Sequence, residues 1–158
     1  MDSQSLLICG IGGVGCTWAK NAHKNCKNLS DLLLIDGDSR SLDESAEGHL
    51  LSLGDSDSID GCAALTPLAN QRMLANAPLT SKVLSDAELV VLLVGLGGGS
   101  GSGAAAEFAR QARRSGCLTI AIAALPFECQ SLRQKIAQKS LHELRSTTDV
   151  CVQVSLEI

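Results

Sequence analysis

Five runs of aliphatic residues divide the chain, and each has the length of one buried β-strand. The runs lie at Ser5–Cys9, Asp31–Ile35, Leu89–Val94, Leu118–Ala123 and Val150–Val154. They are nearly continuous and do not alternate with polar residues, which is typical of parallel strands that helices cover on both faces. The pattern therefore predicts a parallel sheet at the centre of the fold.

Segments between these runs repeat their apolar residues at helical spacing. After the first run, Val14, Trp18 and Ala22 recur every four residues. Two further stripes are formed by Ala105, Phe108, Ala109 and Ala112, and by Leu132, Ile136, Ala137, Leu141 and Leu144. This alternation predicts an α/β, Rossmann-like, doubly wound and mainly parallel sheet, with its ligand at the carboxyl ends of the strands.

Residues 41–61 fit two patterns. Leu42, Ala46, His49, Leu50 and Leu53 satisfy a helical period, whereas His49–Leu53 equally fits a short edge strand. The sequence leaves both interpretations open.

A first glycine-rich loop, Gly10–Gly15, fits the pattern GxGxxG between a strand and a helix. On its own it suggests a dinucleotide fold in which Asp36 or Asp38 contacts a ribose. It fits almost as well an adenylating enzyme of the ThiF type. A tight turn without any ligand is the third alternative.

A second glycine-rich loop follows the third aliphatic run. Six of the nine residues from Gly95 to Gly103 are glycine, and an Ala-rich stretch comes next. Glycine costs conformational entropy and offers no side chain for packing, but it leaves a row of backbone N–H groups accessible. Between a strand and the start of a helix, such a row is suited to hold phosphate. Two loops of this kind predict a nucleotide-binding protein.

The second loop resembles the GGGTGTG signature of the tubulin/FtsZ superfamily. The matching residues read Gly97-Gly98-Gly99-Ser100-Gly101-Ser102-Gly103. The resemblance extends to the first loop, to Asp36–Leu42, to Ala87–Val90, to Pro126-Phe127 and to Leu144–Val154. It implies that residues 1–158 form a single FtsZ-like nucleotide-binding domain, and that the family's central helix and second domain are absent.

The resemblance implies a site for a guanine nucleotide, GTP or GDP, with or without Mg²⁺. Its residues are Gly12, Gly13, Val14, Gly15, Thr17, Asp38, Gly97, Gly98, Gly99, Ser100, Gly101, Ser102, Pro126, Gln130 and Arg133. Backbone amides of both loops would hold the phosphates, Asp38 would lie near the metal and ribose, and Gln130 or Arg133 would contact the ribose. No catalytic residue and no protein metal ligand is assigned.

Three departures from the family pattern affect the expected nucleotide site. Gln130 replaces the family's ribose-contacting Glu, and Asp60–Pro67 has lost most glycines of the loop near the γ-phosphate. The strand that should end in a guanine-reading Asn ends in Ser155-Leu156-Glu157. Preference for guanine over adenine therefore stays open. A nucleotide-free interaction module is a further alternative, beside the adenylating or NAD-binding enzyme.

The family's water-activating carboxylates come from the part that the chain lacks. Without a general base to orient water, weak or no GTPase activity is expected of the chain alone. The resemblance implies a role in a cytoskeletal, cell-division or membrane-remodelling system, with an FtsZ-like or other protein as partner.

Composition narrows the remaining classes of function. The chain has 158 residues, a net charge of −4, one Trp, two Phe and no Tyr, which argues against nucleic-acid binding. Its seven cysteines form no CxxC pair, so a zinc site is not expected. No apolar run approaches 18 residues, and no signal peptide is apparent, so we expect a cytoplasmic protein without a transmembrane segment.

Overall fold

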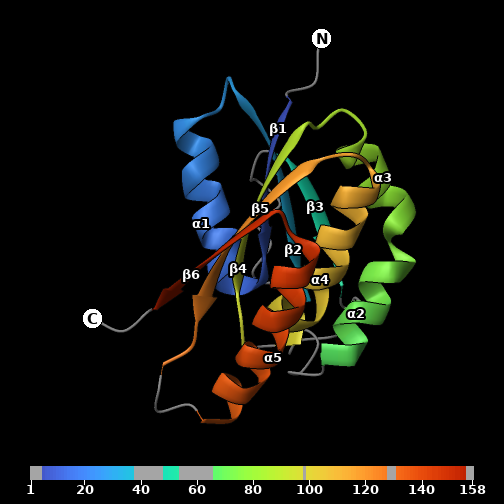
Figure 1. Cartoon of the computed structure of the whole chain (residues 1–158). Helices are drawn as coiled ribbons and strands as arrows, with labels where there is room; N and C mark the ends of the chain where they lie inside the picture. Colours follow the sequence, from blue (N-terminus) through green and yellow to red (C-terminus); the bar gives the residue numbers. More distant parts are fainter. Residues whose placement is uncertain (1–4, 38–47, 54–65, 98, 128–130, 156–158) are drawn as a thin grey trace.

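The computed structural model describes residues 5–37, 48–53, 66–97, 99–127 and 131–155 (Figure 1). Three residues that the sequence assigns to the nucleotide, Asp38, Gly98 and Gln130, lie outside these ranges. The altered loop at 60–65 and the residues 156–157 also lie outside them.

The described strands form one parallel sheet. Their bounds are β1 Leu6–Ile11, β2 Ser30–Asp36, β3 His49–Ser52, β4 Leu89–Gly95, β5 Leu118–Leu125 and β6 Val150–Ser155. They lie in the order β3-β2-β1-β4-β5-β6, and every neighbouring pair is parallel. The predicted doubly wound α/β fold is confirmed, and each of the five aliphatic runs is a strand.

Within the described ranges, five helices cover the sheet. They are α1 Gly12–Asn25, α2 Thr66–Ala75, α3 Ala77–Leu84, α4 Gly99–Arg114 and α5 Ser131–Thr147. In Figure 1, α1 lies on one face of the sheet, and the other four helices lie on the opposite face. The helices that follow the two glycine-rich loops and the last helix were predicted, whereas α2 and α3 were not. None of the helices in the described part is long and apolar enough to cross a membrane.

The larger part of the core lies between the sheet and the four-helix layer. Phe108 of α4 is fully buried, and alanines surround it on the same helix, which lets α4 approach the sheet closely. A smaller cluster, which includes Ile8, Cys16 and Leu93, lies on the α1 side. The core is therefore aliphatic, as the scarcity of aromatic residues requires.

Of the segment 41–61, which fitted both a helix and an edge strand, the part that the structure describes includes a strand. His49–Ser52 pairs with β2 in parallel as the edge of the sheet, and Leu53 N–H donates to the Asp36 carbonyl at 2.8 Å. The helical alternative is wrong for these residues, because the exposed edge of β2 supplies hydrogen-bond partners that a local period does not reveal. Residues 38–47, which carry the rest of that period, lie outside the described part.

Candidate functional site

The two glycine-rich loops follow neighbouring strands. α1 begins at Gly12, directly after β1, and α4 begins at Gly99, shortly after β4. β1 and β4 are adjacent and parallel, so both loops lie at the same edge of the sheet. α1 and α4 leave toward opposite faces of the sheet (Figure 1), so the strand order reverses between β1 and β4, and we call the sheet edge between the two loops the crevice. Ligands of open α/β sheets bind at such a point.

Gly12 and Gly101 bring the two loops into close approach. A Cβ atom on Gly12 would lie 3.6 Å from the Gly101 nitrogen, and Gly12 has φ +80°, which favours glycine. A Cβ on Gly101 would overlap the Gly95 carbonyl oxygen. Backbone of one loop therefore packs directly on backbone of the other, with no side chain between these residues.

The glycines at the start of α1 serve different purposes. A Cβ on Gly15 would overlap the Leu93 carbonyl oxygen and lie 3.0 Å from the Leu93 carbonyl carbon, so Gly15 allows α1 to pack on β4. Gly13 is exposed, and a Cβ there would meet nothing within 4 Å. Thr17 is also exposed, and its hydroxyl donates to the Gly13 carbonyl at 3.0 Å. The packing of α1 on β4 explains why residue 15 is a glycine, whereas no packing contact explains the glycine at residue 13.

The electrostatics of both helix starts suit an anion. The residue before α1 is Ile11, which offers no side-chain cap, and neither α1 nor α4 has an acidic residue in its first turn. The first N–H groups of a helix have no partner within the helix, and the helix dipole places partial positive charge there. Two such ends lie at one crevice.

Ser102 stabilises the second loop itself. Its side chain is only 4% exposed, and its hydroxyl oxygen accepts a hydrogen bond from the Gly97 N–H at 2.6 Å. The Ser140 hydroxyl of α5 donates to the Ser102 carbonyl at 3.2 Å. Gly97 has φ +103°, so this loop depends on a glycine at that position. The sequence showed the serine but not this use of its hydroxyl.

The start of α5 lies against the second loop. A Cβ on Gly97 would lie 3.1 Å from the Arg133 carbonyl oxygen and 3.2 Å from Pro126. Gln134 of α5 is joined to Pro126, since its side-chain amide donates to the Pro126 carbonyl at 2.5 Å. The structure thus brings Pro126 and Arg133, two residues assigned to the nucleotide, next to Gly97. Arg133 is exposed.

Cys16 and Asp36 lie behind the first loop. Burial, and secondarily the charge of Asp36, raises the pKa of the Cys16 thiol to about 12. The thiol donates to the carbonyls of Gly10 and Ile35, each at 3.5 Å. Asp36 is 5% exposed and accepts a hydrogen bond from the Gly37 N–H at 2.7 Å. Cys16 is therefore a neutral buried thiol at physiological pH, not a nucleophile.

The described residues hold no group of three or more His, Cys, Asp or Glu side chains that would bind a metal ion. Asp38, the residue expected near a metal, lies outside them.

Sequence reasoning missed a buried polar network on α4. Glu107 is 2% exposed and accepts hydrogen bonds from Arg110 at 3.0 Å and from the Gln111 amide at 3.3 Å. Gln111 also bonds the Met73 carbonyl of α2 and the Thr80 hydroxyl of α3. The Ala-rich stripe around these residues gives no sign of the network. Its role is to join α4 to α2 and α3.

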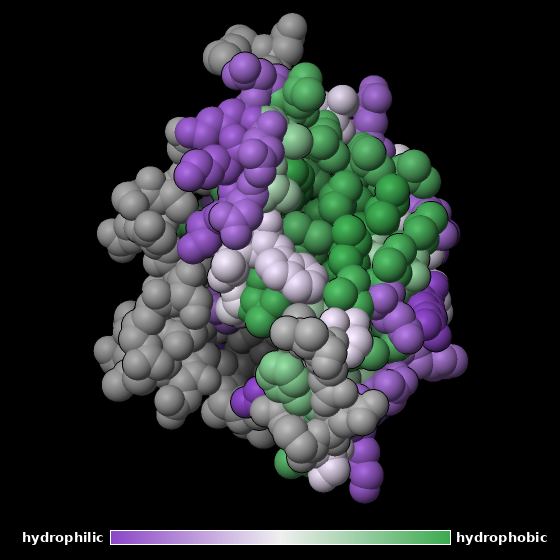
Figure 2. All heavy atoms as spheres, turned by 90° about the vertical axis from the view of Figure 1, so that its left-hand side faces the viewer, coloured by the Kyte–Doolittle hydropathy of each residue, from purple (hydrophilic) through white to green (hydrophobic). Residues whose placement is uncertain are grey.

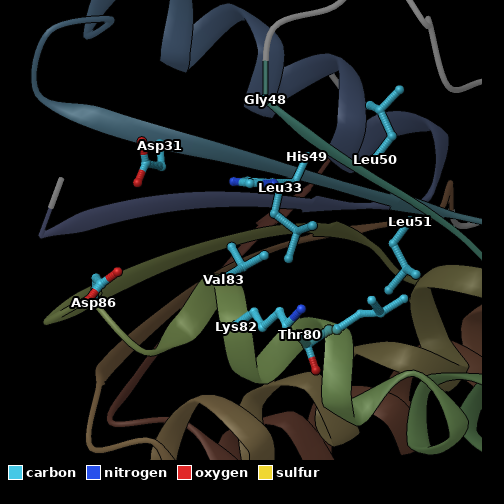
Figure 3. A pocket seen from close by; sticks show the side chains of 11 residues that line it. Asp31, Leu33, Gly48, His49, Leu50, Leu51, Thr80, Lys82, Val83 and Asp86 are labelled. Atoms are coloured by element: carbon cyan, nitrogen blue, oxygen red, sulfur yellow. The ribbon is translucent and has the colours of Figure 1, made fainter. Parts of the chain in front are cut away.

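A cavity of about 630 Å³ lies elsewhere, between β2, β3 and α3 (Figure 3). Asp31, near the start of β2, and Asp86, which precedes β4, lie at one end of the cavity in the figure. Its lining residues are Asp31, Leu33, Gly48, His49, Leu50, Leu51, Leu79, Thr80, Lys82, Val83 and Asp86. None of the residues assigned to the nucleotide is among them.

Comparison with known proteins agrees with the fold described above. The family model "Tubulin/FtsZ family, GTPase domain" matches residues 5–156. The chain is 26% identical to the mitochondrial division protein fszA of Dictyostelium discoideum over 99% of its own length. It is 27% identical to the cell division protein FtsZ of Mycoplasmopsis pulmonis over 98% of its length. It spans only 31% and 40% of these two relatives.

Solved structures show the same fold. An empty FtsZ dimer from M. jannaschii superposes with a TM-score of 0.85 at 22% identity, over 98% of this chain and 46% of that one. CetZ2 from Haloferax volcanii, in a GTPγS-bound protofilament, superposes with a TM-score of 0.82 at 21% identity, over 96% of this chain and 49% of that one. The family model, matched over nearly the whole chain, establishes that this protein belongs to the Tubulin/FtsZ family through its GTPase domain.

Proposed function

We propose that the chain binds a guanine nucleotide, GTP or GDP, in the crevice between its two glycine-rich loops. The close approach of Gly12 to Gly101 carries this proposal, since it joins the uncapped start of α1 to the second loop. A phosphate chain placed there would receive backbone N–H groups from both loops. The exposed Gly13 fits this use, because the open space beside it is what a ligand near the backbone needs.

The remaining residues assigned to the nucleotide contact either its phosphates or its ribose in this proposal. Val14, Gly15 and Thr17 belong to the phosphate side of α1, and Gly97 to Ser102 belong to the phosphate side of the second loop. Pro126 and Arg133 lie beside Gly97 and belong to the ribose side, with Gln130. Asp38 is assigned to the metal and ribose region. Guanine is proposed on family membership.

The proposed activity of the isolated chain is nucleotide binding with weak or no hydrolysis. The first turns of α1 and α4 carry no acidic residue that would orient water toward a phosphate held there. The nearby buried carboxylate, Asp36, hydrogen-bonds the adjacent Gly37 N–H. On this proposal, a general base for hydrolysis comes from a partner protein.

The proposed setting is a cytoplasmic cell-division or cytoskeletal system. The relatives named above include division proteins of bacteria and of mitochondria. The chain spans less than half of them. An FtsZ-like or other protein is proposed as its partner on family membership.

Thermal unfolding with a panel of nucleotides tests the binding proposal. The chain is heated with GTP, GDP, ATP, NAD or no nucleotide, each with Mg²⁺. At a concentration 100-fold above Kd, one bound ligand adds about 2.7 kcal/mol, which raises the Tm of a domain of this size by roughly 5–10 °C. The largest shift is expected with GTP or GDP. A larger shift with ATP or NAD supports the adenylating or dinucleotide-dependent alternative, and no shift with any of them supports the interaction module.

Substitution at Gly13 locates the phosphate. Gly13→Asp adds a carboxylate to open space at the start of α1, where it stabilises the helix dipole but repels an anion. We expect the apo Tm to be kept and the nucleotide shift to be lost. Gly13→Asn has nearly the same shape without the charge and is the matched control. Equal nucleotide shifts in the two variants would contradict a phosphate at this position.

Phosphate release from GTP tests the hydrolysis proposal. We expect a low rate for the chain alone and a higher rate when FtsZ of Mycoplasmopsis pulmonis is added than the two proteins give separately. The Gly13→Asp variant is the control, since it should add nothing to the rate of the partner. A mixture that equals the sum of its parts would refute activation by the partner.

A further inference from the structure

The cavity between β2, β3 and α3 has no part in the proposed nucleotide site. At this border the sheet extends further than the helical layer, because β3 pairs with β2 as an outermost strand, whereas α3 packs mainly on α4 and α2. Gly48 has φ +105°, and a Cβ there would overlap the Leu32 carbonyl oxygen, so a glycine lets β3 begin close to β2. The remaining space of about 630 Å³ lies within the range of roughly 300–1,000 Å³ that small-molecule sites occupy.

The floor of the cavity is one face of β2 and β3. Alternation along β2 places Asp31 and Leu33 on the same face. The register pairs Leu33 with His49 and Ile35 with Leu51, so His49 and Leu51 continue that face on β3. Leu33 is 2% exposed and Leu51 is 8% exposed, and both line the cavity. The floor is therefore apolar along its middle and carries a carboxylate near the start of β2.

α3 forms the opposite wall with one helical face. Lys82 and Val83 follow Leu79 by three and four residues, which places all three on that face. Ser85, the residue after α3, keeps helical backbone angles, so Asp86 continues the same face one turn beyond Lys82 and Val83. Figure 3 shows Val83 pointing across the cavity toward β2. The wall therefore repeats the order of the floor, with apolar side chains followed by a carboxylate.

The two carboxylates, Asp31 and Asp86, lie at the same end of the cavity (Figure 3). Within the described ranges, no hydrogen bond or ion pair involves the side chain of Asp31, Asp86 or Lys82. Lys82 extends away from the two carboxylates in the figure. Asp86 also follows the end of α3, where the helix dipole places partial negative charge. This end of the cavity therefore favours a cation.

The rest of the lining indicates which kind of cation fits. The described residues hold no group of three or more side chains that would bind a metal ion. Carboxylates that solvent reaches attract a small hydrated cation only weakly. A cation with a hydrocarbon chain gains more, because Leu33, Leu51 and Val83 remove the chain from water. From Asp31 to Ile35, the partner of Leu51, the floor covers four strand steps, or about 13 Å.

We propose that this cavity binds a small aliphatic primary amine. Its ammonium group lies beside Asp31 and Asp86, and its chain packs between Leu33 and Leu51 of the sheet and Val83 of α3. A polyamine fits less well, because a second ammonium group would lie among apolar side chains. An aliphatic carboxylate also fits less well, because it would leave both carboxylates of the cavity without a partner.

Calorimetric titration of the whole chain with n-octylamine tests the proposal, and we expect one binding site. n-Butylamine should bind at least about tenfold more weakly, because each CH₂ group removed from water strengthens binding about fourfold. Octanoate and n-octanol keep the long chain without the positive charge. Each should bind at least about threefold more weakly than n-octylamine, because neither forms an ion pair with the carboxylates.

Three substitutions locate the amine. Asp31→Asn and Asp86→Asn each remove one negative charge from the cavity, and each should raise the Kd of n-octylamine at least about threefold. Glu143→Gln is the matched control, since it removes the same charge from an exposed position on α5, which does not line the cavity, and it should leave the Kd unchanged. Circular dichroism checks that the variants fold. Asp86 is exposed, so Asp86→Asn keeps the test valid if Asp31→Asn does not fold.

The aspartate variants also separate the cavity from other apolar surface. Figure 2 shows a continuous hydrophobic area on the face that carries α1, where an amine with a hydrocarbon chain could also bind. Binding there would not respond to Asp31→Asn or Asp86→Asn, because neither residue belongs to α1 or its neighbouring surface on that face.

Four results would overturn the proposal. They are an equal Kd for n-octylamine in the aspartate variants and in Glu143→Gln, tighter binding of octanoate than of n-octylamine, equal binding of n-butylamine and n-octylamine, and no binding of n-octylamine at millimolar concentration. The Gly13→Asp variant should bind n-octylamine with an unchanged Kd, so this inference and the nucleotide proposal fail separately.

Discussion

Gly13 and Gly15 lie two residues apart at the start of α1, yet the structure predicts opposite effects of the same substitution. A Cβ at position 15 would overlap the Leu93 carbonyl oxygen, and it would lie 3.0 Å from the Leu93 carbonyl carbon and 3.1 Å from the Val94 Cα. All three atoms belong to the backbone of β4, so none can rotate away. A Cβ at position 13 would meet nothing within 4 Å.

The size of each effect follows from two opposing contributions. Alanine in a helix is about 0.5–1 kcal/mol more stable than glycine. At position 15 the overlap must be relieved by moving α1 away from β4, and overpacking of this kind costs about 1–3 kcal/mol or more. We therefore expect Gly15→Ala to destabilise the fold by about 1–2 kcal/mol, or roughly 2–8 °C in Tm for a domain of this size. Gly13→Ala should leave the free energy of unfolding unchanged or raise it by up to about 1 kcal/mol.

Urea unfolding followed by circular dichroism measures both variants without any nucleotide, so the comparison concerns packing alone. The difference between the two free energies of unfolding is the informative quantity, because both variants change the same residue type in the same turn. If Gly15→Ala is as stable as Gly13→Ala, α1 does not pack on β4 as closely as described here, and the reasoning fails.

Three other substitutions test separate parts of the fold. The pKa of Cys16 is raised to about 12, so its neutral thiol contributes stability that is fully present below pH 9. This stability is lost as the pH rises from about 9 to 12, by up to about 1.4 kcal/mol per pH unit. Cys16→Ala should flatten the alkaline limb of a plot of unfolding free energy against pH, and an unchanged slope would contradict the assignment. Glu107→Ala should cost about 1–3 kcal/mol in urea unfolding, because it removes the acceptor of one N–H of the buried Gln111 amide and the hydrogen-bond partner of Arg110. The exposed Arg113→Ala should stay within about 0.5 kcal/mol. Gly116 has φ +84° with open space around it, so Gly116→Ala should lower the stability by about 1–2 kcal/mol through backbone strain alone. Gly116→Asn should lower the stability by less. Equal losses of stability in thermal unfolding would argue against strain.

The sheet was predictable because its strands carry a local signal. Runs such as Leu89–Val94 are apolar on both faces, which at this length is typical of a buried parallel strand. β3 was ambiguous because four residues are too short to separate strand from helix by period. Its pairing with β2 decides the outcome.

The helices α2 and α3 were missed for a physical reason. Among residues 67–75 of α2, only Ala69 and Met73 are fully buried, and the others are polar or partly exposed, so this stretch shows little helical periodicity. The helix is held mainly by contact with α4, including the bond from Gln111 to the Met73 carbonyl. Such contacts join residues far apart in sequence and leave no local pattern.

The candidate site was predictable in its backbone but not in its side chains. Glycine spacing placed both loops at the crevice, because strand order brings the ends of β1 and β4 together. The sequence did not show that the Ser102 hydroxyl is used by the Gly97 N–H, or that Gln134 is joined to Pro126. Side-chain direction depends on packing that a motif does not encode.

The two borders of the sheet differ in how well they resist self-association. β3 is four residues long, whereas β6 has six residues, Val150–Ser155, and contains no lysine, no proline and no charged residue. Proteins usually protect an open strand border with such residues, because its free N–H and C=O groups can template pairing with another chain. Among the described strands none pairs with the outer border of β6, so we expect concentrated solutions of this protein to aggregate by adding strands there, a liability that a ligand in the crevice would not relieve.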